Sequence, residues 1–173
     1  MKYIEELHKL FMLYNFYLQE IDSLINWAMD RLTNDEEEND NNVVLLAISN
    51  DEPEARELTQ KILNRYMVQA ELSEEYLCGK YIVELHQWYK DGKIEIIELY
   101  KIMTKLFSGL GYPDWLVMLS RNCEYATDMT VFEKHFQDEF NNIADLWKKC
   151  DSLEEFKQKY DRKTSNSHDV ENC

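Results

Sequence analysis

The chain has 173 residues, of which 45% are hydrophobic and 13% aromatic, and it carries a formal net charge of −15. This length and apolar content suffice to bury a core without disulfides or metals. Four Gly and two Pro are too few for the frequent turns of an all-β fold. The negative charge disfavours nucleic acid and anionic membrane surfaces as partners, whereas it attracts basic proteins. A simpler interpretation, also open, is that acidity keeps the protein soluble.

The cysteine content and the N-terminus both point to a cytoplasmic protein. The four cysteines are widely spaced and form no C-x-x-C pair: Cys78, Cys123, Cys150 and Cys173. This spacing favours reduced thiols over a disulfide framework. The first ten residues, MKYIEELHKL, are interrupted by charges and predict no signal peptide. No apolar run approaches the roughly 20 residues that span a bilayer. We therefore expect no membrane partner.

Apolar residues recur every three or four positions along almost the whole chain, which predicts helices. In the N-terminal part, helices are expected over residues 2–14, 17–32, 42–49 and about 51–69. The first two form either one long helix or two, because Asn15 is the only weak position between them. Residues 34–42, NDEEENDNN, are expected to form an acidic loop. The fourth helix has a clear start signal, with Asp51 as the cap, Pro53 in the first turn and Glu54 at capping-box spacing.

The rest of the chain predicts five further helices. They are expected over residues 73–90, 94–107, from 113 onward, 131–148 and 153–160. Gly109 is expected in the left-handed position that ends the second of these, and Pro113 opens the third. Capping boxes at Thr130–Glu133 and Ser152–Glu155 are expected to open the last two.

Together these elements predict an all-α fold. We expect a single domain, residues 1–161, of eight or nine helices, followed by a polar, disordered tail over residues 162–173. Short connections make successive helices antiparallel neighbours. No motif recurs at a fixed period, so an irregular bundle and a stack of helical hairpins are both open.

No pattern of catalytic or metal-ligating residues is present. Glu5 and His8 supply one Glu-x-x-His pair, but a carboxylate-bridged di-iron bundle needs two. A calcium loop counted from Asp35 would place Asp40 where Gly is needed and Leu46 where Glu is needed. The zinc-protease, nucleophile-elbow and phosphate-loop motifs are absent from the sequence. We therefore expect no metal, no cofactor and no catalytic residue, and an enzyme with a helical fold is the least favoured alternative.

The negative charge is concentrated in one segment. Residues 34–58 contain nine acidic groups and one basic group, whereas residues 59–108 contain seven of each. The acidic residues are Asp35, Glu36, Glu37, Glu38, Asp40, Asp51, Glu52, Glu54 and Glu57. The last four open a helix, where carboxylates are locally favourable. The first five repel one another, which is typical either of a solvated loop or of a surface for a basic partner. Both interpretations stay open, and we treat all nine as candidate partner-binding residues.

A second candidate surface lies at Tyr112-Pro113-Asp114-Trp115. This sequence places two aromatic rings and a carboxylate at a helix entrance. Because Tyr and Trp are enriched in the cores of interfaces, we include Tyr112, Asp114 and Trp115 among the candidate partner-binding residues. The alternative is a helix start with a buried Trp.

The N-terminal pattern resembles a known group of proteins. The pattern covers about 35 residues. It consists of INWAMDRL (25–32), an acidic gap, NVVLLAIS (42–49) and a helix that starts with Pro. It resembles the helical immunity proteins of bacterial polymorphic-toxin systems, including those of contact-dependent growth inhibition, with Trp27, Ala28, Leu46 and Ala47 at the matching positions. The resemblance implies a cytoplasmic protein that binds a cognate basic toxin, often a nuclease. It would block the toxin by covering its active site with carboxylates that stand in for phosphates.

A different class of binding protein is the second hypothesis. A helical adaptor or regulatory module would bind its partner through an apolar groove, and its affinity would depend little on salt. The salt dependence of binding therefore separates this hypothesis from the first.

Overall fold

The computed structural model describes residues 3–34, 40–66 and 73–168, with side chains up to residue 163. Within these ranges the chain forms nine α-helices, one short 3₁₀ helix and no strand, which confirms the predicted all-α class. The backbone contacts divide the chain into two compact units, unit 1 (Met1–Leu72) and unit 2 (Ser73–Cys173). None of the helices in the described ranges combines the length and the apolar character that a membrane span requires.

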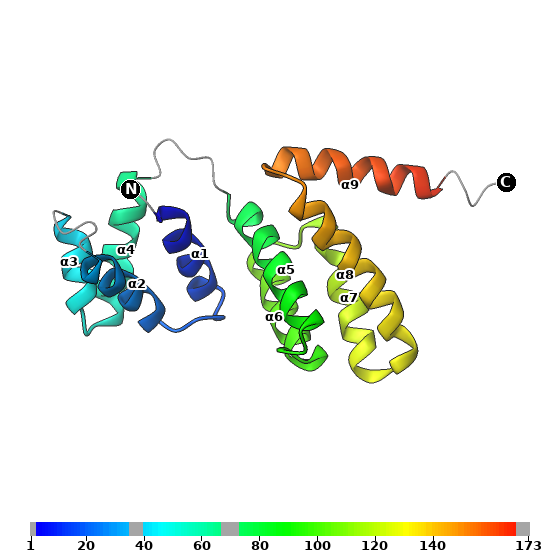
Figure 1. The fold of residues 1–173 in the computed structure, drawn as a ribbon, viewed down its shortest axis with the longest axis horizontal. Helices are drawn as coiled ribbons and strands as arrows, with labels where there is room; N and C mark the ends of the chain where they lie inside the picture. Colours follow the sequence, from blue (N-terminus) through cyan, green and yellow to red (C-terminus); the bar gives the residue numbers. More distant parts are fainter. Residues whose placement is uncertain (1–2, 35–39, 67–72, 169–173) are drawn as a thin grey trace. The chain divides into compact units, whose positions relative to one another are not determined.

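Unit 1 contains the first four helices around one core (Figure 1). They are α1 (Ile4–Asn15), α2 (Asp22–Thr33), α3 (Asn41–Ile48) and α4 (Glu52–Tyr66). Tyr17 has a φ of 58° and the Leu18 amide bonds back to the carbonyl of Leu13, so α1 and α2 are two helices and not one. The core combines apolar residues from all four: Leu7, Phe11, Leu24, Trp27, Ala28, Val43, Leu46, Ala55, Leu58, Ile62 and Leu63.

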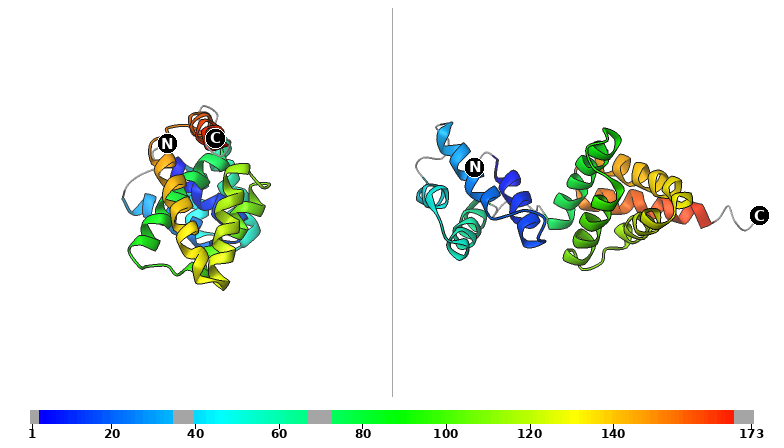
Figure 2. Two further views of the ribbon diagram at one scale, coloured as in Figure 1. Left: turned by 90° about the vertical axis from the view of Figure 1, so that its right-hand side faces the viewer. Right: turned by 90° about the horizontal axis from the view of Figure 1, so that it is seen from below.

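Unit 2 contains four helices packed side by side and a fifth across one end (Figures 1 and 2). The elements are α5 (Glu74–Lys90), α6 (Ile96–Gly109), α7 (Asp114–Asp128), the 3₁₀ helix η1 (Thr130–Phe132), α8 (Glu133–Lys148) and α9 (Leu153–His168). Helix α9 lies across the end at which α5 begins and α8 ends. This end of the unit therefore brings the first turn of α5, the α6–α7 turn and α9 together.

Three local predictions in unit 2 were wrong. Gly109 is the last residue of α6, and the left-handed positions fall later, at Gly111 (φ 71°) and Tyr112 (φ 66°). Residues Thr130–Phe132 form a 3₁₀ turn, so α8 begins one turn later than the expected capping box and has no side-chain cap. Helix α9 continues to His168, although disorder was expected from residue 162. Residues 162–168 contain no Gly or Pro that would end the helix earlier. Residues 169–173 lie outside the described residues.

The centre of unit 2 is Trp147, a fully buried indole on α8. Phe156 of α9 stacks on it with ring centroids 3.8 Å apart and an interplanar angle of 7°, and Trp115 of α7 meets it edge to face at 5.3 Å. On α5, Gly79 lies so close that a Cβ atom built there overlaps the indole ring. Only glycine allows α5 and α8 to approach to this distance.

We predict that Gly79→Ala destabilises unit 2. The added methyl group overlaps Trp147, and overpacking of this kind costs about 1–3 kcal/mol. Gly109→Ala is the matched control, because this glycine is exposed at the end of α6 and Ala gains up to about 1 kcal/mol over Gly in a helix. Thermal unfolding followed by circular dichroism should show a melting temperature lowered by Gly79→Ala alone. Equal melting temperatures for the two variants would contradict the packing described here.

Candidate partner-binding surfaces

The acidic segment predicted from the sequence divides into three groups with different environments. Asp35, Glu36, Glu37 and Glu38 lie outside the residues that the structure describes. Asp40 lies in the interior of unit 1. Asp51, Glu52, Glu54 and Glu57 lie on α4 or directly before it, and all four are exposed.

Asp40 is held inside unit 1 and is not presented to a partner. Only 3% of its surface is exposed. One carboxylate oxygen accepts the backbone N–H of Asn42 at 2.9 Å and so caps α3. The other accepts the Tyr66 hydroxyl at 2.5 Å and the Arg65 guanidinium at 3.4 Å. A buried carboxylate needs such partners to offset its desolvation, which explains this acidic residue without a partner protein. We therefore remove Asp40 from the candidate surface.

The remaining four carboxylates form what we call the α4 acidic surface: Asp51, Glu52, Glu54 and Glu57. Asp51 accepts the Glu54 amide at 3.1 Å, as its predicted capping role requires. The Glu54 carboxylate accepts the Ser49 hydroxyl at 2.9 Å, and Glu52 accepts the Tyr14 hydroxyl at 2.6 Å. Glu57 pairs with Lys61 one turn later, and this hydrogen bond lowers the pKa of Glu57. Each carboxylate is thus oriented from within unit 1 while it stays exposed to solvent.

Tyr14 is a neighbour of this surface that the sequence did not identify. Its ring packs against the core of unit 1, and its hydroxyl reaches Glu52 across 38 positions. The hydrogen bond to Glu52 and burial raise the pKa of Tyr14. Together they line a small cavity of about 190 Å³ with Asn15, Tyr17, Gln19, Glu20 and Arg56.

The second candidate surface is a pocket in unit 2, at the end of the helices that α9 covers. Its volume is about 410 Å³, within the range of roughly 300–1,000 Å³ typical of ligand sites. We call it the Tyr112 pocket, and it is lined by Glu75, Leu110, Tyr112, Pro113, Asp114, Trp115, Lys157, Tyr160 and Asp161. All three residues predicted here from the sequence, Tyr112, Asp114 and Trp115, therefore lie in one pocket.

The α6–α7 turn places the aromatic residues of this pocket. Gly111 and Tyr112 both have positive φ, which turns the chain so that Tyr112 is 63% exposed with its ring against Phe107. Trp115 is only 2% exposed, and its indole N–H donates to Glu75 Oε1 at 2.8 Å. The expected alternative, a helix start with a buried Trp, thus describes Trp115, whereas Tyr112 and Asp114 are exposed.

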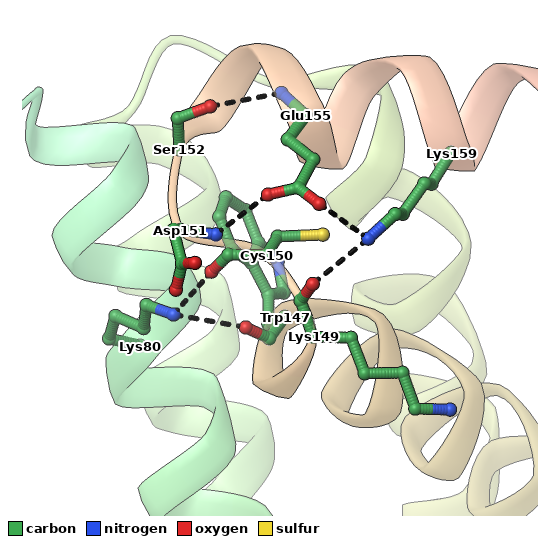
Figure 3. Close-up of polar contacts among 8 residues, drawn as sticks. All are labelled: Lys80, Trp147, Lys149, Cys150, Asp151, Ser152, Glu155 and Lys159. Carbon is green, nitrogen blue, oxygen red and sulfur yellow. Dashed lines mark hydrogen bonds and ion pairs between the residues drawn. The ribbon is translucent and has the colours of Figure 1, made fainter.

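Helix α9 supplies the opposite wall, and Figure 3 shows what fixes its start. Lys80 of α5 donates to the carbonyl groups of Trp147 (3.1 Å) and Cys150 (2.6 Å) at the end of α8. Ser152 accepts the amide of Glu155, whose carboxylate accepts the Asp151 amide, so the predicted helix start at Ser152 is confirmed. These bonds set the direction in which α9 leaves the turn.

The pocket is acidic although it contains a lysine. Lys157 donates to Glu75 Oε2 at 2.9 Å, so these two charges offset each other. Asp114 and Asp161 add two further carboxylates. Burial raises the pKa of Tyr160, and the charges of Glu139, Asp114 and Asp161 raise it further. No sequence pattern links Glu75, Lys157 and Tyr160 to Tyr112, because Glu75 lies on α5 and the other two on α9, and only the packing of these helices brings them to the α6–α7 turn.

A second cavity in unit 2, of about 450 Å³, lies where α5 ends and α6 begins. Its lining includes Tyr89, Lys90 and Glu95, and His86 with Asn141, whose Oδ1 lies 2.7 Å from His86 Nε2. Glu95 is the only carboxylate in its lining. Within the described ranges, no three His, Cys, Asp or Glu side chains are grouped to hold a metal ion.

No known protein family, curated protein or solved structure matches this chain. The resemblance to toxin-immunity proteins is therefore still a prediction.

We predict that His86 makes stability depend on pH. Burial lowers its pKa below the ordinary value of 6.5, an effect that outweighs the opposing bond to Asn141. The unfolded chain then binds more protons than the folded one below that value, so the free energy of unfolding falls as the pH drops through it. Replacing His86 by Gln, which does not titrate, should reduce this fall.

Urea unfolding one pH unit above and one below 6.5 measures the effect. His135→Gln is the matched control, because His135 is exposed on the same helix as Asn141. An undiminished pH dependence in His86→Gln would contradict the prediction.

Proposed function

We propose that this protein is an immunity protein that binds a basic toxin domain and neutralises it by covering its active site. The observation that supports this best is the α4 acidic surface. Four exposed carboxylates lie in or beside the first turns of one helix, in the segment that carries more than half of the net charge. Such a surface matches the cationic active site of an enzyme that acts on phosphates.

The internal bonds of these carboxylates favour binding. A side chain that is already oriented loses less rotational freedom when a partner binds. Tyr14, Ser49 and Lys61 orient Glu52, Glu54 and Glu57 in this way. Each carboxylate also keeps acceptor capacity for a partner's Lys or Arg, since an ionised carboxylate accepts about four hydrogen bonds.

The residues that carry the resemblance support the proposal only indirectly. Trp27, Ala28 and Leu46 are buried in the core of unit 1, and Ala47 packs against it. The three buried residues cannot contact a partner and Ala47 is partly buried, so the resemblance concerns mainly how α2 and α3 pack together. The contacts themselves must come from the exposed residues around this core.

A helical adaptor is the second candidate, and one observation favours it. Leu45 and Ile48, one turn apart on α3, are 45% and 66% exposed, and Met29 on α2 is 49% exposed. Exposed apolar side chains on neighbouring helices are typical of protein-binding surfaces. A partner bound through them would show an association rate that depends little on ionic strength.

We predict that removing charge from the α4 acidic surface slows association with the toxin. In the double variant Glu52→Gln and Glu57→Gln, the amide at position 52 still accepts the Tyr14 hydroxyl. The association rate should fall several-fold at about 30 mM ionic strength and much less at about 500 mM, because salt screens steering. The partner to test is the product of the neighbouring upstream gene, and stopped-flow mixing measures the rate.

The matched control is the double variant Glu5→Gln and Glu6→Gln. These residues are also exposed in the first turn of a helix of unit 1, and the change in net charge is the same. If both double variants slow association equally, the effect arises from the net charge of the protein and not from the α4 acidic surface. Rates that are unchanged in Glu52→Gln/Glu57→Gln at low salt would remove the α4 acidic surface from the proposal and favour the adaptor.

A further inference from the structure

The Tyr112 pocket has a size and a position that allow it to bind one side chain of another protein. Its volume of about 410 Å³ can hold one long side chain with water around it. It opens beside the α6–α7 turn, where Tyr112 and Asp114 are exposed. A loop or helix of another protein can therefore reach it.

The charges around the pocket select for a cation. Lys157 is engaged with Glu75, and no Lys or Arg of the described part of the chain forms an ion pair with Asp114. Asp161 lines the same pocket from α9. The lining thus holds three carboxylates, Glu75, Asp114 and Asp161, and one lysine, so its net charge attracts a cation and repels an anion.

Two tyrosine rings add a second feature that favours a cation. The Tyr112 ring is 63% exposed and half-buried Tyr160 is held by stacking on Phe156, whereas Trp115 is only 2% exposed and offers no ring face to a ligand. The faces of Tyr and Trp rings attract Lys and Arg side chains. The pocket thus combines aromatic rings with carboxylates, and this combination suits a side chain with an apolar stem and a cationic end.

We propose that the Tyr112 pocket receives one Lys or Arg side chain of the protein partner, with its stem against the aromatic rings and its charge near Asp114 and Asp161. The identity of the partner rests on the proposed function, but the preference for a cation does not. A quaternary ammonium ligand fits less well, because it has no N–H to donate to the two carboxylates, whereas ammonium and guanidinium groups do.

Binding can be tested without the partner. The full chain, labelled with ¹⁵N, is titrated with Nα-acetyl-arginine amide and, separately, with its neutral isostere Nα-acetyl-citrulline amide. The reporter is the indole N–H of Trp115, which donates to Glu75 in the lining of the pocket. Trp27 in unit 1 and Trp88, near the far end of α5, are internal controls. We expect a saturable shift of the Trp115 signal with the arginine probe alone.

Two variants locate the interaction. Asp114→Asn should weaken probe binding about fivefold, whereas Asp128→Asn, the same change at the exposed end of α7, should leave it unchanged. Tyr112→Asn removes the exposed ring and should weaken binding similarly, since Asn tolerates positive φ. Unchanged far-UV circular dichroism and Trp147 signals establish that each variant is folded.

Several outcomes would overturn the proposal. These are no saturable shift of Trp115, equal shifts with the citrulline probe, or equal weakening by Asp114→Asn and Asp128→Asn. Binding of tetramethylammonium in preference to arginine would instead assign the pocket to a quaternary ammonium ligand. If the arginine probe does not bind, the proposal that α4 binds the toxin is unaffected. If the toxin does not bind, the result with the arginine probe is still valid. The two proposals can therefore be contradicted separately.

Discussion

The contact between Gly79 and Trp147 is the constraint on which the structure of unit 2 depends. Because position 79 has no side chain, the indole of α8 can lie directly on α5. Phe156 then stacks on the indole, and Trp115 packs against both rings. One close approach between two helices thereby fixes α7 and α9 relative to the bundle, and these two helices supply most of the Tyr112 pocket.

Unit 1 shows why a count of acidic residues does not define a binding surface. Asp40 and Glu57 belong to the same acidic segment, yet the first is a buried cap and the second is exposed on α4. Part of the negative charge of this segment therefore has a local structural role, because Asp40 caps α3. What supports binding is the remainder: carboxylates that face solvent and are oriented by neighbours such as Tyr14.

Local signals in the sequence predicted local structure well. Asp51 caps α4 and Ser152 opens α9 as expected, because a cap bonds to amides only two or three residues away. The 3₁₀ turn before α8 and the left-handed Gly111 and Tyr112 were missed, since their conformations depend on how α6, α7 and α8 pack. Tertiary neighbours were beyond prediction: Asp40 meets Tyr66 across 26 positions, and Lys157 meets Glu75 across 82. The Tyr112-Pro113-Asp114-Trp115 motif identified one side of the Tyr112 pocket. No sequence pattern indicated the side that α9 supplies.

The function that we propose is neutralisation of a basic partner by covering its active site. The most direct measurement takes the product of the neighbouring upstream gene and assays its toxic activity with increasing amounts of this protein. We expect this activity to be lost at one equivalent, with a complex that buries about 1,200–2,000 Å² of surface. A toxin that stays fully active in the presence of excess protein, or a neighbouring product that is not a toxin and does not bind, would contradict it.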